Sequence, residues 1–148
     1  MTIFTDEHFM RLALAEGRKA LPACLPNPPV GCVLVRNQQV IAAAHTQPPG
    51  HPHAEAGALR QIVGGLEDVT AYVTLEPCAF HGRTPSCAKA LIERGLGRVV
   101  VAVLDPDPRN QGRGIQMLRD AHIPVDLGVC ASEASTDLAP HLALPDNR

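Results

Sequence analysis

The chain has 148 residues, a formal net charge of −2 and 45% hydrophobic residues, with one Tyr, three Phe and no Trp. This length suits one domain that buries roughly two thirds of its unfolded surface, and the composition predicts an aliphatic core. The small net charge, without a run of Lys or Arg, argues against a nucleic acid or an anionic membrane as partner. A small-molecule partner is therefore expected.

The cysteine count and the N-terminal residues indicate a compartment. No stretch approaches 18 apolar residues, and residues 1–7 lack the basic start and apolar run of a signal peptide, which predicts a cytoplasmic protein. Five cysteines form an odd set. In a reducing compartment, metal binding explains Cys78 and Cys87 better than a disulfide framework does. Packing accounts for Cys32 and Cys130, which lie in apolar surroundings.

The first predicted elements are a helix and a strand pair. Thr5 is expected to cap a helix that carries apolar residues at helical spacing as far as Ala20 and ends at Pro22 and Pro26. Residues 30–35 form a short apolar run typical of a buried strand, and residues 36–39 form a turn into a second strand, 40–45. This first strand pair is therefore antiparallel.

The middle of the chain predicts a second helix, a strand and a third helix. The proline-rich residues 48–52 break regular structure, and a helix follows from His53 to about Val63, where two glycines end it. Residues 71–75 read as a strand. Thr84 is then expected to cap a helix that has Pro85 in its first turn and runs to about Arg94, so that Cys87 also lies in its first turn.

The rest of the chain repeats this alternation. It predicts a strand at 98–104, a helix at about 114–121, a strand at 124–127 and a helical tail from Ser132, with irregular structure at the end because of Pro140 and Pro145. Strands that alternate with helices favour a mostly parallel sheet covered on both faces. We expect one domain over residues 1–148.

The residues with the strongest chemical pattern are His53-Ala54-Glu55, then Cys78 and Cys87. One imidazole and two thiolates give a zinc ion three ligands and leave one tetrahedral position open for water, which is typical of a catalytic rather than a structural site. Glu55 is the candidate for moving protons. Taken singly, each residue is better explained by packing or solvation. Together they fit one pattern, because His53 and Cys87 coincide with the predicted starts of two helices and Cys78 follows a predicted strand.

The physical setting favours this chemistry. Cys78 and Cys87 are expected at or near helix N-termini, where backbone N–H groups and the helix dipole favour a thiolate. Glu55 in a closed site should have a raised pKa, because burial penalises the carboxylate. The alternative for Glu55 is a solvated acid in a first turn.

The spacing of these residues resembles a known family. Nucleobase deaminases combine His-x-Glu with Pro-Cys-x-x-Cys, but here eight residues separate the cysteines, which resembles the pyrimidine deaminase of riboflavin biosynthesis. The resemblance runs through these segments: PNPPVG at 26–31, GHPHAE at 50–55, TLEPCAFHGRTPSC at 74–87, DP at 105–106 and GRG at 112–114. It implies a cytidine deaminase-like, three-layer α/β/α sandwich with a five-stranded mixed sheet. It also implies zinc on His53, Cys78 and Cys87, with Glu55 as proton shuttle.

The same resemblance implies that four further residues bind the substrate. They are Asn27, His45, Arg83 and Asp105. Each also has an ordinary explanation as a turn residue, a strand end or a solvated loop charge. Related deaminases further imply a homodimer or a higher homo-oligomer.

Some positions depart from the family pattern. Ala79-Phe80 replaces Ser-His and Asp107 replaces Asn, changes that should make a phosphorylated ligand less welcome. The reductase domain that usually follows is not in this sequence. The resemblance therefore implies a zinc-dependent hydrolytic deaminase of an aminopyrimidine-type heterocycle, and the departures leave open the same chemistry on another aminopyrimidine or fused heterocycle in specialised metabolism. A tRNA deaminase and a non-catalytic, zinc-stabilised domain are weaker alternatives.

Overall fold

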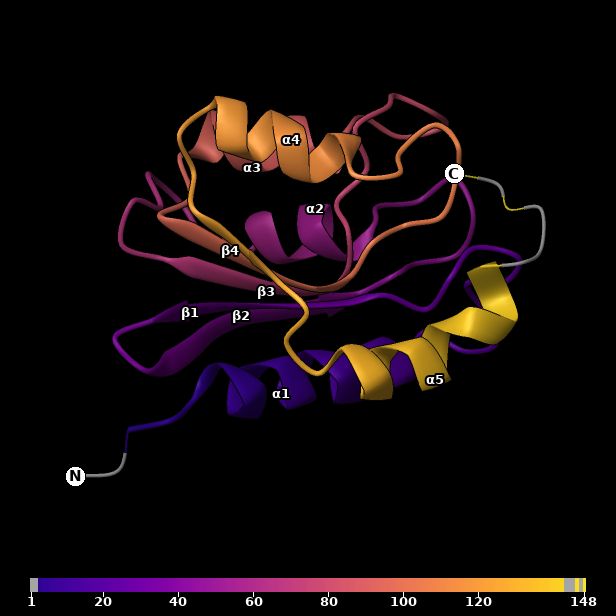
Figure 1. Cartoon of the computed structure of the whole chain (residues 1–148), viewed down its shortest axis with the longest axis horizontal. Coiled ribbons are helices and arrows are strands. Elements are labelled where there is room, and N and C mark those ends of the chain that lie inside the picture. The colour runs from indigo at the N-terminus through magenta and orange to yellow at the C-terminus, as the bar shows by residue number, and fades with distance from the viewer. Residues whose placement is uncertain (1–2, 143–145, 147) are drawn as a thin grey trace.

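Helices and strands alternate along the chain in the computed structural model, which describes residues 3–142, 146 and 148. Their bounds, in chain order, are α1 Asp6–Arg18, β1 Gly31–Arg36, β2 Gln39–His45, α2 Ala54–Leu59, β3 Thr70–Leu75, α3 Cys87–Arg94, β4 Arg98–Val103, α4 Arg113–Asp120, β5 Val125–Leu127 and α5 Ala131–Leu142. One sheet lies between two helical layers, with α1 and α5 on one face and α2, α3 and α4 on the other (Figure 1). The predicted three-layer α/β/α sandwich is confirmed.

The direction of the strands sets where functional side chains meet. The five-stranded sheet has the order β2-β1-β3-β4-β5. β1 pairs antiparallel with both β2 and β3, whereas β3, β4 and β5 pair parallel. Only β1 therefore runs against the other four strands, which confirms the mixed sheet. As a result the amino end of β1 and the carboxyl ends of β2, β3 and β4 meet at one edge, where such sheets place their ligand sites.

The hairpin between β1 and β2 follows from its two central residues. Asn37 and Gln38 both have positive φ angles, 50° and 64°. Positive φ at both central positions matches the right-handed twist of the flanking strands. The predicted turn at 36–39 is confirmed, and a register shift between Leu34 and Val35 marks a bulge in the pair.

Helix α1 begins as predicted but ends earlier. The Thr5 side chain accepts a hydrogen bond from the His8 N–H at 3.2 Å, which caps the helix. The last helical residue is Arg18, so the prediction that Pro22 and Pro26 end this helix is wrong. The Lys19 N–H bonds back to the Glu16 and Gly17 carbonyls, which closes the last turn before either proline is reached.

Helix α2 is shorter than the predicted 53–63 because a distant arginine binds the carbonyls beyond its end. The Arg94 guanidinium donates to the carbonyl oxygens of Leu59, Ile62 and Gly64. Carbonyl groups engaged in this way are satisfied without a continuing helix. The chain therefore leaves the helix at Leu59 and exposes 97% of Val63.

Helix α3 starts later than predicted. Its N-cap is Ser86, whose side chain accepts the Lys89 N–H at 3.2 Å, and not Thr84. The Thr84 hydroxyl lies 3.1 Å from the His53 ring instead. Cys87 is thus the first helical residue, and the predicted first-turn position for Cys87 is confirmed.

The last helix differs from its prediction at its C-terminal end. Helix α5 starts at Ala131 and continues through Pro140 to Leu142, so Pro140 does not end it. Pro145 lies outside the described residues. In the part of the chain that the structure describes, none of the helices combines the length and the hydropathy needed to cross a bilayer.

The core is aliphatic, as the composition predicts. It is centred on β3 and β4, where Val73, Val99, Val100 and Val101 are fully buried. Phe9 of α1 adds one of its few rings and packs 5.4 Å from the ring of Tyr72. This packing fixes the sheet against α1 and leaves the edge formed by the strand ends free to carry polar groups.

A close approach of α1 to β1 gives a test of this packing. A Cβ on Gly31 would lie 1.8 Å from the Ala13 carbonyl oxygen, and neither backbone can yield easily. We expect Gly31→Ala to lower the free energy of unfolding by at least about 2 kcal/mol in urea denaturation. Gly65→Ala is the control, since only the flexible Glu67 carboxylate is near. Equal stabilities of the two variants would contradict the packing.

Candidate metal centre and substrate pocket

Three residues with metal-ligating side chains meet at the sheet edge. His53 occupies the N-cap position of α2, Cys78 follows β3, and Cys87 is the first residue of α3. Their ligand atoms all lie within 4.8 Å of one another, and no other such group occurs among the described residues. The structure thus brings together the three residues that the sequence predicts as ligands.

The separations within this cluster fit a tetrahedral metal ion. The His53 Nδ1 atom lies 3.8 Å from the Cys78 sulfur and 3.4 Å from the Cys87 sulfur. Zn–S bonds of about 2.3 Å and Zn–N bonds of about 2.0 Å at a tetrahedral angle put N and S ligands about 3.6 Å apart. The donor set and its geometry therefore suit Zn²⁺.

Cys78 uses the helix that Cys87 begins. It lies in a loop, and its sulfur accepts the backbone N–H of Cys87 at 3.2 Å. A hydrogen bond from the Cys87 thiol, assisted by His53, lowers the pKa of Cys78 to about 4, while the same contact raises the pKa of Cys87. Without metal, the pair thus holds one proton on Cys87, and a cation can replace that proton.

A neighbouring hydroxyl orients His53. Its Nδ1 atom faces the two sulfurs, and its Nε2 atom lies 3.1 Å from the Thr84 Oγ1. An Nε2–H that donates to this hydroxyl leaves Nδ1 unprotonated for a metal, as outer-shell partners of ligating histidines commonly do. Burial opposes protonation of His53, but Cys78 and Glu55 outweigh it and raise its pKa. The sequence did not identify Thr84, because its role depends on a residue 31 positions away.

Glu55 is buried beside the cluster, with 4% of its surface exposed. Burial, with a further contribution from the Cys78 charge, raises its pKa to about 7. This agrees with the raised pKa expected for a proton carrier and not with a solvated acid in a first turn. A carboxyl group with such a pKa exchanges protons readily near neutral pH.

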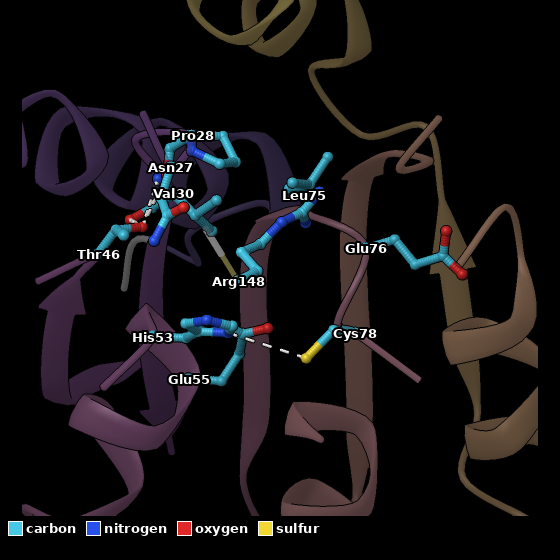
Figure 2. A pocket seen from close by; sticks show the side chains of 10 residues that line it. All are labelled: Asn27, Pro28, Val30, Thr46, His53, Glu55, Leu75, Glu76, Cys78 and Arg148. Carbon is cyan, nitrogen blue, oxygen red and sulfur yellow. Dashed lines mark hydrogen bonds between the residues drawn. The ribbon is translucent and has the colours of Figure 1, made fainter. Parts of the chain in front are cut away.

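A pocket opens over these residues (Figure 2). It is lined by Asn27, Pro28, Val30, Thr46, His53, Glu55, Leu75, Glu76, Cys78 and Arg148. In Figure 2 the Glu76 side chain points away from His53 and Cys78. The remaining cavity measures about 20 Å³, which is room for about one water molecule. The Arg148 side chain, 7% exposed, fills part of this space.

One of the four predicted substrate residues lines this pocket, and a second contacts a residue that lines it. Asn27 is buried and lines it, and Asp105 reaches it through Arg148, whose Nη1 lies 2.6 Å from the Asp105 Oδ2. His45 instead contacts Glu16 at 2.9 Å. Arg83 is exposed and lines a second cavity of about 350 Å³, which shares His53 with the first. The structure therefore does not bring His45 and Arg83 into the pocket that contains Glu55.

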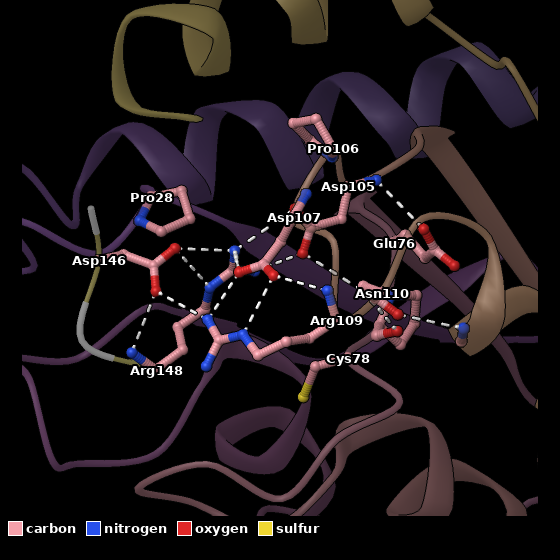
Figure 3. A network of polar contacts seen from close by, with 12 residues as sticks. Pro28, Glu76, Cys78, Asp105, Pro106, Asp107, Arg109, Asn110, Asp146 and Arg148 are labelled. Carbon is pink, nitrogen blue, oxygen red and sulfur yellow. Dashed lines mark hydrogen bonds and ion pairs between the residues drawn. The ribbon is translucent and has the colours of Figure 1, made fainter. Parts of the chain in front are cut away.

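A charged network surrounds Arg148 (Figure 3). Asp105, Asp107 and Asp146 all contact this guanidinium, and Arg109 pairs with Asp107 at 2.6 Å. The hydrogen bond from Arg109 lowers the pKa of Asp107 to about 2. Arg109 also lies 4.1 Å over the ring centroid of Phe80. The carboxylate at position 107, where the family carries Asn, is thus accompanied by two cations that the sequence alone did not place.

Comparison with known proteins gives a consistent result. The family model described as the cytidine and deoxycytidylate deaminase zinc-binding region matches residues 4–103. The riboflavin biosynthesis protein RibD of Aquifex aeolicus is 46% identical over 129 residues, which are 87% of this chain and 36% of that protein. These matches confirm the resemblance on which the sequence analysis relied.

Solved structures of RibD-type proteins are also similar to this chain. The RibD structure of Acinetobacter baumannii superposes with a TM-score of 0.87 at 43% identity, over 93% of this chain and 38% of that one. A Thermotoga maritima diaminohydroxyphosphoribosylaminopyrimidine deaminase/5-amino-6-(5-phosphoribosylamino)uracil reductase gives 0.84 at 35% identity, over 93% of this chain and 40% of that one. The chain thus spans between a third and two fifths of the length of these relatives.

The raised pKa of Glu55 predicts a pH dependence of stability in the metal-free protein. The folded state binds this proton up to about pH 7, whereas the unfolded chain releases it near 4.5. Raising the pH through this window therefore lowers the stability of the wild type. Glu55→Gln removes the effect, so its stability relative to wild type should rise by about 3 kcal/mol between pH 4 and pH 8. Urea denaturation in the presence of a chelator measures this, and a pH-independent difference would contradict it.

Proposed function

The chain belongs to the cytidine and deoxycytidylate deaminase zinc-binding family, and we propose that it is a zinc-dependent hydrolytic deaminase that releases ammonia from an aminopyrimidine-type heterocycle. The observation that carries this proposal is the His53, Cys78 and Cys87 cluster beside the buried Glu55. Three protein ligands leave a tetrahedral ion one open position, and a carboxyl group with a pKa near 7 lies next to it.

Zinc would be held by His53 Nδ1 and by the sulfurs of Cys78 and Cys87. When bound, such an ion lowers the pKa of a water ligand and makes it a nucleophile near neutral pH. Each sulfur has a reason to stay anionic, because the N–H of Cys87 supports Cys78 and a cation replaces the proton on Cys87. Thr84 would hold the His53 ring in the ligating orientation.

Glu55 would carry the protons. Its carboxylate would accept one proton from the attacking water and pass it to a ring nitrogen. It would then take the second proton of that water and deliver it to the amino group, which leaves as ammonia when its C–N bond breaks. A group with a pKa near 7 can take up and release protons with little driving force lost in either direction. Its burial keeps bulk water from competing for those protons.

The substrate we propose first is a diaminopyrimidine ribosyl phosphate of the riboflavin pathway, since the Thermotoga maritima relative is named for that deamination. The alternative is another aminopyrimidine or fused heterocycle, motivated by Phe80 and Asp107. Arg109 and Arg148 offset the charge of Asp107, so repulsion of a phosphate is weaker than the sequence predicted. Turnover of phosphorylated and unphosphorylated ribosides, compared side by side, separates the two.

The extent of the domain, the cellular location and the oligomeric state are further parts of the proposal. We propose a single deaminase domain over residues 1–148, a cytoplasmic location and a homodimer or higher homo-oligomer. A tRNA deaminase would need a basic and aromatic binding surface, and the chain has one Tyr, three Phe and no Trp. A non-catalytic zinc domain has no use for a buried acid with a pKa near 7.

Glu55→Gln tests the function directly. The amide keeps the size of the side chain but cannot accept the water proton. We expect zinc content to stay at one ion per chain while ammonia release falls by about 10²- to 10⁴-fold or more. Ammonia release near the wild-type rate would refute the role of Glu55. A wild type that purifies without zinc and still turns over would refute the metal-dependent reaction.

Arg148→Ala tests how the substrate enters. A cavity of about 20 Å³ cannot hold a pyrimidine ring while Arg148 fills the pocket, so the substrate has to displace that side chain. Removing the side chain should lower KM several-fold and change kcat by less than about twofold. Arg11→Ala, which breaks only a surface pair with Glu133, serves as control. A raised KM would show instead that Arg148 binds the substrate.

A further inference from the structure

One fully buried amide links the loop before α4 to the segment that carries Cys78. Asn110 has 0% of its surface exposed. Its Oδ1 accepts the N–H groups of Ala79 at 3.2 Å and Gly114 at 3.1 Å. Its Nδ2 donates to the Pro77 carbonyl and to the Asp105 Oδ2, both at 3.3 Å. Two donor and two acceptor contacts use the full capacity of the amide group.

These contacts bracket one proposed metal ligand. Pro77 and Ala79 are the two neighbours of Cys78, so Asn110 holds the peptide groups on both sides of it. The Cys78 carbonyl also accepts the Ser86 hydroxyl and the Ala88 N–H, and its sulfur contacts the Cys87 N–H and His53, so these contacts come from α3, its N-cap and α2's N-cap. Asn110 therefore fastens this loop residue to α4, a second and separate support.

The packing leaves this segment little room to shift. A Cβ on Gly114 would lie 1.9 Å from the Pro77 carbonyl oxygen, so the start of α4 lies directly against the segment. The buried Glu76 carboxylate accepts the N–H groups of Asp105, Gly112 and Ile115. Glu76 thus secures the loop after β4, whereas Asn110 joins that loop to the peptides beside Cys78.

We propose that Asn110 is a positioning residue that sets the geometry of Cys78 for metal binding and at the same time orients the Asp105 carboxylate at the substrate pocket. Asn110 touches neither metal nor substrate and acts through these two residues. The inference rests on the proposed function only in taking Cys78 as a metal ligand. Asn110 links the metal cluster to the substrate pocket, since its side chain contacts both the peptide group before Cys78 and the Asp105 carboxylate.

The chemistry of the side chain explains why other residues of this size do not suffice. Leucine has a similar volume but leaves the Pro77 carbonyl and two buried N–H groups unpartnered, which loosens the segment around Cys78. Aspartate keeps the acceptor for Ala79 and Gly114 but loses both donors and adds a charge beside Asp105. Aspartate therefore breaks only half of the contacts.

Metal binding gives a test that does not depend on turnover. We expect Asn110→Leu to lower Zn²⁺ affinity by about 10- to 100-fold in competition with a chelator, and Asn110→Asp to lower it by less. The thiolate-to-metal charge-transfer band of the Co²⁺-loaded variants should weaken or shift, because the Cys78 sulfur is no longer fixed. KM for the substrate should also rise, through Asp105.

A control separates positioning from general stability. Leu138→Ala creates a cavity in α5 on the other face of the sheet, and it should lower stability without changing Zn²⁺ affinity by more than about twofold. If both Asn110 variants bind Zn²⁺ as tightly as the wild type and keep its Co²⁺ spectrum, Asn110 is merely structural and the proposal is wrong. If Asn110→Leu does not fold, the affinity and spectrum of Asn110→Asp decide. A wild type that binds zinc but releases no ammonia would refute the proposed function and leave this test intact.

Discussion

The Cys78 sulfur accepts the backbone N–H of Cys87 at 3.2 Å, and this contact joins the loop after β3 to the first turn of α3. Much of the site follows from it. Unpaired N–H groups at a helix start favour an anion, so they stabilise a thiolate that the buried surroundings would otherwise disfavour. The same contact places both sulfurs near the His53 Nδ1, at 3.8 Å and 3.4 Å. Cys87 has to be the first helical residue for this to hold, which is why the N-cap at Ser86 matters.

Glu55 and Glu76 are both buried, but their surroundings suit them to different roles. Glu76 accepts three backbone N–H groups, from Asp105, Gly112 and Ile115, and so fixes the loop before α4. Glu55 is equally buried but lies among thiols and an imidazole, and its pKa rises to about 7. Glu55 is therefore a group suited to proton transfer near neutral pH.

The sequence singled out His53, Cys78 and Cys87, which the structure brings together, because a local pattern places them beside helix starts and a strand end. It failed where the deciding partner is distant along the chain. Thr84, the predicted N-cap of this helix, engages His53 instead, and Ser86 caps the helix. The early end of α2 depends on Arg94, more than 30 residues away. Asn110 is not among the residues that the sequence predicts for the site, and only the folded structure shows it fully buried against Pro77 and Ala79.

The contacts of Arg148 also limit what the substrate can be. A ligand that displaces Arg148 removes a guanidinium from Asp105, which has no exposed side-chain surface. Asp105 keeps its hydrogen bonds from Asn110 Nδ2 and the Asp107 N–H, but a buried carboxylate that loses a charged partner is destabilised unless other donors replace that partner. The amino groups and ring N–H of an aminopyrimidine supply such donors, whereas a phosphate dianion has none. If the proposed function holds, Asp105 would favour the heterocycle, and a phosphate attached to the substrate would extend toward other cations, away from this carboxylate.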